Sequence, residues 1–455
     1  MYKIVSILSI ILLFHTVQLS GALTLEEAIH QLKTDNLEIQ TATIDVKTAQ
    51  ENEKKASGNY WGTLNFIQDV ARSNDAGNVF GFKLTSREAT FGDFGFADFL
   101  SPPSGTTDIL QVQPHDLNYP KDRNFFQSKL KYEVPLFTGF KLSAYSEIMH
   151  SMTKMKTLQK EQVINEKIYE LRKSYYDMAL LQNSIKNLTI ILQNIHTLEN
   201  TTKSMIAMGY AKKVDLLEVK AKEGNVQRLL VQMHSNEKLL YHYISFLLNK
   251  KITHIVVPLK KVAMPTKKTE EILLHNLDIQ KAKSGLTVRK GMLDVAHAAY
   301  YPTVGAFAEV ATADNSFLGN AANHQSYTVG ARLTWNVFNG GIRSAEVEKS
   351  QLEYLKTKTQ VQLARAGVQL QIAKLKTEIA SLDEELDSLH KELLLANEIY
   401  SNYEGRYKEK LVSMSDVIIK QSQQIQKILQ LQVVNNKRNK RIFALEKLEN
   451  NGEKK

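Results

Sequence analysis

The sequence predicts a mostly α-helical protein that also carries a few membrane-type β-strands and is built from two copies of one unit. Three observations predict this fold class. All eight prolines lie outside residues 136–257 and before residue 303, and proline-free tracts of that length favour long helices. Two segments in each half alternate apolar and polar residues, as membrane strands do. Short motifs recur at constant offsets, which indicates a duplication.

Residues 1–22 have the composition of a secretory signal peptide. Lys3 supplies a positive charge, residues 4–14 form an apolar run too short to span a bilayer, and Ser20 and Ala22 are small residues at a plausible cleavage site. We therefore expect the protein to be exported. No later stretch is long and apolar enough for a transmembrane helix, so any membrane span is expected to consist of strands. The absence of cysteine excludes disulfides, thiolate metal sites and cysteine nucleophiles.

The duplication rests on four pairs of similar motifs. Two pairs are separated by 240 residues and two by 201: residues 36–40 with 276–280, 60–64 with 300–304, 134–139 with 335–340, and 214–217 with 415–418. The change of offset places about 39 extra residues in the first copy, between Leu64 and Val134. This extra segment is rich in glycine, phenylalanine, aspartate and proline, so we expect it to be a long exposed loop.

Each copy is expected to contribute two strands. Residues 326–337 alternate between apolar and polar side chains, and residues 129–136 do so in the first copy. Partner strands are expected at residues 61–71 and 301–311. Side chains that recur every second residue share one face, and on a membrane strand the apolar face contacts lipid. The residues that we expect to face lipid in the second copy are Tyr327, Val329, Leu333, Trp335 and Val337.

Long helices are expected to follow the strands. Apolar residues from Ile372 to Tyr403 recur in alternating steps of three and four, and the same phase is found 201 residues earlier, from Met178 to Ile195. A mean spacing near 3.5 residues is typical of a coiled coil. A helix from about residue 140 to residue 208 would be roughly 100 Å long, and it could bury its apolar stripe only against neighbouring helices.

Four such strands cannot close a barrel by themselves, because membrane barrels have about eight strands or more and open edges expose unpaired backbone to lipid. The barrel must therefore be completed by symmetry, with eight strands in a dimer or twelve in a trimer. An eight-stranded barrel fills its interior with side chains, so an open pore needs more strands. The coiled-coil helices would then form a tube that continues the barrel.

The chain resembles the TolC family of outer-membrane efflux proteins over nearly the whole mature sequence. The resemblance is carried by the order and spacing of the duplicated units, the strand entry at residues 300–303, the strand exits at residues 136–139 and 337–340, and the helical-hairpin turns. It implies a homotrimer with a twelve-stranded outer-membrane β-barrel, a periplasmic α-helical tunnel and a mixed equatorial domain. It also implies docking to a periplasmic adaptor (membrane fusion) protein and to an inner-membrane pump of RND or ABC type.

The resemblance assigns roles to residues at the two hairpin turns. The adaptor-docking tips that it implies are Gly209, Tyr210, Ala211 and Asp215 in the first copy and Lys410, Leu411 and Val412 in the second. Asp416 matches an acidic ring at the tunnel entrance and Tyr407 matches a gate tyrosine, so both are expected at the pore constriction. Lys410 stands where the family has glycine, so this turn is expected to differ or to contact the adaptor less specifically. Helix capping is an equally good explanation for Asp215 and Asp416.

The expected domain boundaries follow the repeats. In chain order they are a signal peptide at 1–22, an N-terminal equatorial segment and helix at 23–59, a first barrel hairpin with a long loop at 60–137, a first long helical hairpin at 138–249, an equatorial segment and helix of the second copy at 250–299, a second barrel hairpin at 300–338, a second long helical hairpin at 339–445, and a charged C-terminal tail at 446–455.

The expected function is a passive exit duct of a tripartite export system, in the outer membrane of a diderm bacterium and with a large periplasmic portion. Type I protein secretion through the same duct stays an alternative. A soluble periplasmic coiled-coil adaptor or structural protein is the alternative from another class.

No enzymatic activity, cofactor or metal site is expected, because the chain lacks His-Glu-x-x-His, Gly-x-Ser-x-Gly and phosphate-binding glycine-rich motifs. The formal net charge of the chain is +10, and the basic residues form a cluster only at Lys437, Arg438, Lys440 and Arg441. We expect this cluster to lie on a solvated C-terminal tail rather than to bind nucleic acid.

Overall fold

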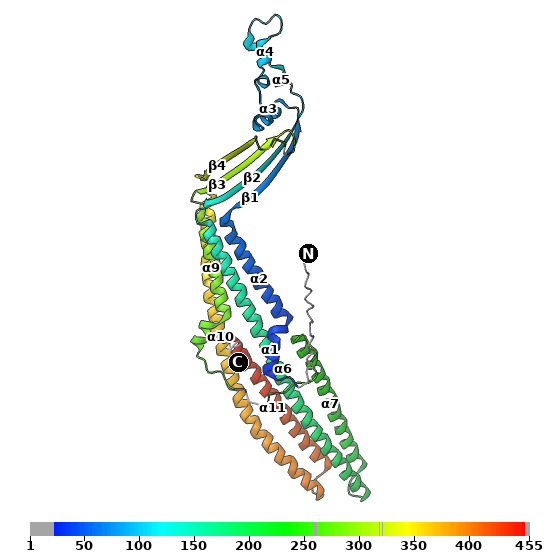
Figure 1. Cartoon of the computed structure of the whole chain (residues 1–455). Helices are drawn as coiled ribbons and strands as arrows, with labels where there is room; N and C mark the ends of the chain where they lie inside the picture. Colours follow the sequence, from blue (N-terminus) through cyan, green and yellow to red (C-terminus); the bar gives the residue numbers. More distant parts are fainter. Residues whose placement is uncertain (1–21, 259–261, 318, 321, 451–455) are drawn as a thin grey trace, which may run out of the picture. The chain divides into compact units, whose positions relative to one another are not determined.

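The computed structural model describes residues 22–258, 262–317, 319–320 and 322–450, and Figure 1 shows its trace. The predicted signal peptide lies outside these residues except for Ala22. The chain divides into two compact units. Among the described residues, the helical unit comprises those within 22–46, 156–282 and 361–450, and the sheet unit comprises those within 47–155 and 283–360.

Within the described residues, the structure is mostly helical and has four strands, as the sequence predicts. In chain order, the elements are α1 (Leu25–Asp35), α2 (Leu37–Gly58), η1 (Asn59–Trp61), β1 (Thr63–Ser73), α3 (Ala76–Thr85), η2 (Phe91–Phe94), α4 (Phe96–Leu100), η3 (Ile109–Gln111), α5 (His115–Asn118), β2 (Arg123–Phe137), α6 (Lys141–Ala207), α7 (Lys213–Leu247), α8 (Thr269–His275), α9 (Leu277–Ala298), β3 (Thr303–Asp314), β4 (Gln325–Thr334), α10 (Ile342–Lys408) and α11 (Met414–Leu448). A search of these helices finds none whose length and apolar character would let it cross a membrane.

Corresponding helices of the two copies have equal lengths. α2 and α9 each contain 22 residues, α6 and α10 each contain 67, and α7 and α11 each contain 35. α10 begins 201 positions after α6, and α11 begins 201 positions after α7. The predicted duplication is therefore confirmed, and it extends to the ends of the long helices.

The repeated motif at residues 36–40 and 276–280 places an asparagine at the same joint in both copies. Asn36 Oδ1 accepts two N–H groups from the first turn of α2 (3.0 and 3.1 Å), while its Nδ2 donates to the carbonyl of Leu247 at the end of α7 (2.8 Å). Asn276 makes the same contacts with the first turn of α9 (3.0 and 3.2 Å) and with Leu448 at the end of α11 (3.2 Å). Each buried amide thus satisfies orphan groups of one helix start and one helix end.

The coiled-coil positions form the core of the helical unit. Buried members of the predicted stripe in α10 are Ile372, Leu375, Ile379, Leu386, Leu389 and Tyr400, and those in α6 are Met178, Leu188 and Ile195. They belong to four clusters that include apolar side chains of α7, α8 and α11, such as Val219, Ile272 and Phe443. Since each stripe packs against other helices, the predicted seam is confirmed.

The four strands form one antiparallel sheet in the order β1-β2-β3-β4. Thr63 lies opposite Glu133 in the first pair of strands, and Thr303 lies opposite Thr334 in the last. Within the described residues, β1 and β4 are the edges of this sheet. Each edge therefore presents a row of backbone N–H and C=O groups that no strand of the same chain pairs.

The last strand is shorter than the alternation predicts. β4 ends at Thr334, so Trp335 and Val337 lie beyond it. The guanidinium group of Arg343, in the first turn of α10, donates to the carbonyls of Asn336 (2.9 Å) and Val337 (3.3 Å). These carbonyls accept hydrogen bonds from an arginine side chain rather than from a neighbouring strand. The strand pairing of β4 therefore stops at Thr334, although the alternation of apolar and polar residues continues in the sequence.

The extra segment between β1 and β2 is largely exposed, as its composition predicts, but it is not an irregular loop. It contains the short helices α3, η2, α4, η3 and α5, drawn beyond the strands in Figure 1. Val79 of α3 is buried, and the ring of Phe82 stacks on that of Phe125 at a centroid distance of 4.2 Å. Glu88 forms an ion pair with Arg123 at the start of β2. The packing is confined to the part of the segment around Val79 and Phe82, because Phe91, Phe94, Phe96 and Phe99 are 48–79% exposed.

The basic cluster near the C-terminus is also not on a solvated tail. All four residues lie within α11, which continues to Leu448, so residues 446–448 belong to this helix. Arg438 is buried and pairs with Asp383 of α10. Lys440 pairs with Asp177 of α6 (3.1 Å). The prediction failed because the acidic partners are distant in sequence, where a local reading of charge cannot find them.

Candidate functional site

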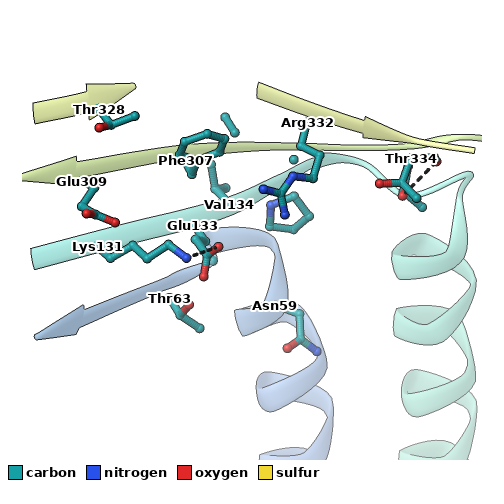
Figure 2. A pocket seen from close by; sticks show the side chains of 15 residues that line it. Asn59, Thr63, Lys131, Glu133, Val134, Phe307, Glu309, Thr328, Arg332 and Thr334 are labelled. Carbon is teal, nitrogen blue, oxygen red and sulfur yellow. Dashed lines mark hydrogen bonds and ion pairs between the residues drawn. The ribbon is translucent and has the colours of Figure 1, made fainter. Parts of the chain in front are cut away.

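The two faces of the sheet differ in chemistry. Polar and charged residues occupy alternate positions on one face, where they line a hollow of about 640 Å³ (Figure 2). Figure 2 shows Lys131, Glu133, Glu309 and Arg332 extending from the same side of β2, β3 and β4. Lys131 Nζ lies 2.9 Å from Glu133 Oε1. Charges of both signs on one sheet face are typical of a surface that contacts water, not lipid.

The opposite face carries exposed apolar side chains. Strand register places Leu64, Phe66 and Val70 of β1, Leu130 of β2, Val310 of β3, and Tyr327, Val329 and Leu333 of β4 on this face. These eight side chains are between 47% and 81% exposed. An exposed apolar surface of this extent is unfavourable in water and has to be covered. A strand face on which every second residue is apolar is suited to contact with lipid. The structure therefore places Tyr327, Val329 and Leu333 on one apolar face, as the alternation predicts.

Aromatic side chains gather where the strands meet the helices of the sheet unit. The exposed members are Tyr60, Trp61, Phe140, Tyr300, Tyr301, Trp335 and Phe338. Trp335 Nε1 donates to the carbonyl of Tyr300 (3.2 Å), and Tyr132 Oη donates to the carbonyl of Trp61 (2.7 Å). Aromatic rings with a satisfied polar atom are enriched at the boundary between lipid and water. Trp335, although beyond β4, thus belongs to this belt.

The two hairpin tips have the same backbone turn in spite of their different residues. Gly209 has φ +82°, and Lys410, its counterpart 201 positions later, has φ +69°. Tyr210 N–H donates to the carbonyl of Met205 (2.8 Å), and Leu411 N–H donates to that of Arg406 (2.9 Å). A left-handed residue at this point is the usual end of a helix. The expectation that Lys410 changes the turn is therefore wrong for the backbone.

The side chains at the tips are arranged differently. Lys410 Nζ lies over the ring of Tyr210, 3.2 Å from its centroid, so the two tips touch through a cation–π contact. Tyr210 and Leu411 are 61% and 62% exposed. Ala211 and Val412 are partly buried and pack against the core beneath the tips. The tips thus offer an aromatic ring, a leucine and a lysine to an outside partner.

Asp215 and Asp416 both cap helices. The Asp215 carboxylate accepts the backbone N–H of Lys212 (2.7 Å) at the start of α7. At the start of α11, the Asp416 carboxylate accepts both the hydroxyl (2.6 Å) and the N–H (3.1 Å) of Ser413, and the Asp416 N–H donates back to the Ser413 hydroxyl (3.2 Å). The hydrogen bonds from Ser413 lower the pKa of Asp416, so the carboxylate is charged at neutral pH. Asp416 is also exposed, which leaves it accessible to ions.

Tyr407 does not lie on the surface of the chain. It is 5% exposed, within a cluster of apolar residues from both hairpins. Its hydroxyl lies 3.4 Å from Thr202 Oγ1 of α6, and burial raises the pKa of Tyr407. In this conformation Tyr407 joins the two hairpins.

Two groups of His and acidic residues within the described part of the chain could offer three ligand atoms each: Glu88, Asp314 and His324, and His196, Glu199 and Glu223. In the first group, Glu88 is paired with Arg123, and the Asp314 carboxylate accepts N–H groups from Asn315 and Asn320. In the second group, Glu199 is paired with Lys203 (3.0 Å). Since protein donors already occupy these carboxylates, neither group is a strong candidate for a metal site.

Sequence reasoning missed Glu309, which lies opposite Lys131 in the strand register on the polar face. The signal was available, since Glu309 lies in the predicted strand 301–311 between apolar neighbours. Arg343 was also missed. Its guanidinium, 4.7 Å from the centroid of the Tyr300 ring, donates to the Ala299 carbonyl (2.9 Å) and thereby joins the end of α9 to the start of α10.

Comparison with known proteins agrees with this geometry. Residues 269–448 match the family model described as Outer membrane efflux protein. A search of curated proteins finds no match.

Solved structures of transmembrane channels are similar over nearly the whole chain. CusC, whose structures describe transmembrane channel formation, is 14% identical, with 93% of this chain and 91% of that chain covered and a TM-score of 0.78. The MtrE outer membrane channel of Neisseria gonorrhoeae, in its open state, is 14% identical, with 94% and 89% covered and a TM-score of 0.75. The CmeC outer membrane channel of Campylobacter jejuni is 13% identical, with 94% and 86% covered and a TM-score of 0.75. At these identities the likenesses establish the fold.

Proposed function

We propose that the chain, whose residues 269–448 match the outer membrane efflux protein family, is a member of this family and forms the passive exit channel of a tripartite export system in the outer membrane. The family is one of transport channels, not of enzymes. The observation that carries the proposal is the sheet with one apolar, exposed face, one charged face and two unpaired edges. An isolated chain of this kind would expose both the apolar face and the edges, so it requires lipid and further strands.

Three copies satisfy both requirements. If β1 of one copy pairs with β4 of the next, three chains form a closed barrel of twelve strands with no free edge. The face with Lys131, Glu133, Glu309 and Arg332 then lines the pore, and the face with Leu333 contacts lipid. A dimer would give eight strands, whose interior is filled by side chains. A conducting channel therefore favours the homotrimer.

The hairpin tips are the proposed contact with the periplasmic adaptor. Tyr210 is a large, exposed side chain at the end of the first hairpin, and tyrosine is enriched among the residues that anchor protein interfaces. Leu411 adds exposed apolar surface at the end of the second hairpin. Around a threefold axis, three copies of Asp416 would form an acidic ring that attracts cations. Tyr407, which joins the hairpins, would have to lose its contact with Thr202 if the hairpins separate to widen the entrance. An inner-membrane pump of RND or ABC type would complete the system.

Two alternatives are weighed against this proposal. Type I protein secretion would use the same trimer and the same duct, with an ABC transporter as the pump. A soluble periplasmic coiled-coil protein is disfavoured by the exposed apolar face of the sheet and by the aromatic belt, neither of which a soluble rod needs. Identifying the pump that copurifies with the chain would separate efflux from protein secretion.

The test is to fractionate cells, purify the protein in detergent and record it in planar bilayers. We expect the protein in the outer-membrane fraction, with the mass of three subunits, and with steady conductance. A periplasmic soluble pool would support the coiled-coil alternative. A stable monomer that conducts would refute the closure of the barrel by symmetry.

A further inference from the structure

One end of the sheet is covered on its polar face and bare on its apolar face. Val310 and Ala311 are neighbours on β3, so their side chains point to opposite faces. Val310, on the apolar face, is 56% exposed, whereas Ala311, on the same face as Glu309, is 5% exposed. Phe125 of β2 lies on this polar face as well and is 7% exposed. Thr328, nearer the helices on the polar face, is exposed, so the cover is confined to one end.

The cover is the start of the extra segment between β1 and β2. α3 lies against β3, and the ring of Phe82 of α3 stacks on that of Phe125 at a centroid distance of 4.2 Å. Glu88, just after α3, pairs with Arg123, which is two positions before Phe125 on β2 and therefore on the same face. β1 leads from α2 to α3, so α3 lies at the end of the sheet that is remote from α2 (Figure 1).

The rest of the segment is attached to α3 and carries exposed aromatic rings. The ring of Phe94 packs edge-on against that of Phe80 of α3, at a centroid distance of 5.0 Å, and Asp93 pairs with Lys83 of α3. The exposed rings are those of Phe91, Phe94, Phe96 and Phe99. Apolar side chains that reach into a pore narrow it and hinder the passage of water and ions.

We propose that this segment forms a constriction at the outer mouth of the channel, which limits the size of the solutes that leave. The inference rests on the proposed function, in which the polar face of the sheet lines the pore and the long helices are periplasmic. Each chain then places its α3 on the pore side of the barrel wall, at the end away from the periplasm. Three segments therefore share one opening, and their exposed rings supply the apolar surface of the constriction.

Two contacts fasten the constriction to the barrel wall. One is the stack of Phe82 on Phe125, and the other is the ion pair of Glu88 with Arg123, whose side chains are 28% and 14% exposed. Because the ion pair is largely screened from water, its loss should weaken the attachment more than the loss of an exposed pair would. Glu88 and Phe82 are therefore the residues whose substitution should widen the outer mouth.

The first test is the single-channel conductance of the full-length protein in planar bilayers. Replacing residues 76–118 by a short glycine–serine turn removes the constriction, and Glu88→Gln loosens it, so both variants should conduct more than the native channel. Neutral polyethylene glycols of graded mass, added as size probes, should enter both variants at a mass that the native channel excludes. Asp116→Asn is the matched control, because it removes one negative charge from the same segment at a side chain that is 84% exposed.

The second test does not depend on conduction. The chain has no cysteine, so Ala311→Cys supplies a single thiol on the covered part of the polar face. A charged thiol reagent should label this cysteine slowly, and about fivefold or more faster when Glu88→Gln is added, because a hydrogen bond between charged groups is lost. Thr328→Cys, which is exposed on the same face, should be labelled at one rate with and without Glu88→Gln.

The outcomes separate the constriction from the export function. Equal conductance and equal polymer exclusion in the native channel and in the channel without residues 76–118 would overturn the constriction and leave the export channel intact. A protein that conducts in neither form would refute the export channel, and the constriction with it. If the shortened chain fails to assemble, Glu88→Gln and Phe82→Ala decide, and native conductance in both would overturn the proposal. Labelling of Ala311→Cys that Glu88→Gln leaves unchanged would also contradict it, since the cover would then not depend on this ion pair.

Discussion

The hairpin tips allow a sharp test, because two copies of one turn place different residues at the same left-handed position. Gly209 has φ +82° and Lys410 has φ +69°. A residue with a Cβ costs about 1–2 kcal/mol in this conformation, and glycine costs about 0.4–1 kcal/mol through the entropy of the unfolded chain. Gly209→Ala should therefore destabilise the first tip by about 1 kcal/mol.

The reverse change at the second tip should have little net effect. Lys410→Gly relieves about 1–2 kcal/mol of strain. It also loses about 0.4–1 kcal/mol to the entropy of glycine and about 0.5–1 kcal/mol of the cation–π contact with Tyr210. These opposing terms leave a net change close to zero. Lys410→Ala keeps the strain and loses the contact, so it should cost about 0.5–1 kcal/mol.

The assay is amide hydrogen exchange at the tips, since heat unfolding of a membrane trimer is commonly irreversible and local opening is still at equilibrium. A loss of 1 kcal/mol corresponds to about a fivefold faster exchange, so Gly209→Ala should speed exchange of the Tyr210 N–H by about that factor. Gly224→Ala is the control, because Gly224 lies inside α7 with open space around it. Unchanged exchange in Gly209→Ala would refute the left-handed turn. Strong protection in Lys410→Gly would show that the contact with Tyr210 contributes nothing.

Four further predictions concern other residues of the chain. Asp383→Asn leaves the buried Arg438 without its counter-charge and should lower the stability of the proposed trimer by about 1–3 kcal/mol, less than for a fully buried pair because the Asp383 side chain is 41% exposed. Arg438→Met leaves only the half-exposed Asp383 and should cost less; the order of the two dissociation temperatures on gels checks this. Leu333→Arg should cost about 2–4 kcal/mol of membrane stability near the midplane, and Arg332→Leu on the opposite face should alter only conductance; equal assembly defects would contradict the assignment of the faces. Asp416→Ala should reduce cation selectivity more than Asp215→Ala does, as measured by the reversal potential across a salt gradient. Unchanged selectivity in Asp416→Ala would mean that Asp416 has only its capping role. The pKa of Asp416 is lowered in the folded protein, so the stability that its capping contributes is fully present above the ordinary pKa of 3.8 and is lost as the pH falls through the lower folded pKa. Protection of the tip amides from hydrogen exchange should therefore decrease in that pH range in the native protein and stay constant in Asp416→Asn.

The elements that sequence predicted well are those with a regular period or an exact repeat. The coiled-coil stripe of α10 and the alternation of β4 depend only on spacing, and spacing is visible in one sequence. The helix-capping role of Asp416 was likewise visible, since Ser413 lies three residues before it.

The features that sequence missed depend on residues that meet only after folding. Arg438 resembled a tail residue because Asp383 lies 55 positions away. The segment between β1 and β2 resembled an irregular loop because its packing depends on contacts such as that between Phe82 and Phe125, 43 positions apart. At Lys410, the residue type suggested a different turn, but the surrounding helix end imposes the same backbone as at Gly209.

The equal helix lengths in the two copies limit how this protein can change during evolution. Deleting one residue from α6 would rotate every later position of that helix by about 100° and move its apolar stripe away from its neighbours. The same deletion would shorten α6 by one residue relative to α10, so the two hairpin tips would no longer be level. The contact between Lys410 and Tyr210, which joins the tips, would then be lost. Length variation should therefore be tolerated mainly where no second copy must match it, and the segment between β1 and β2, present in one copy alone, is free of this constraint.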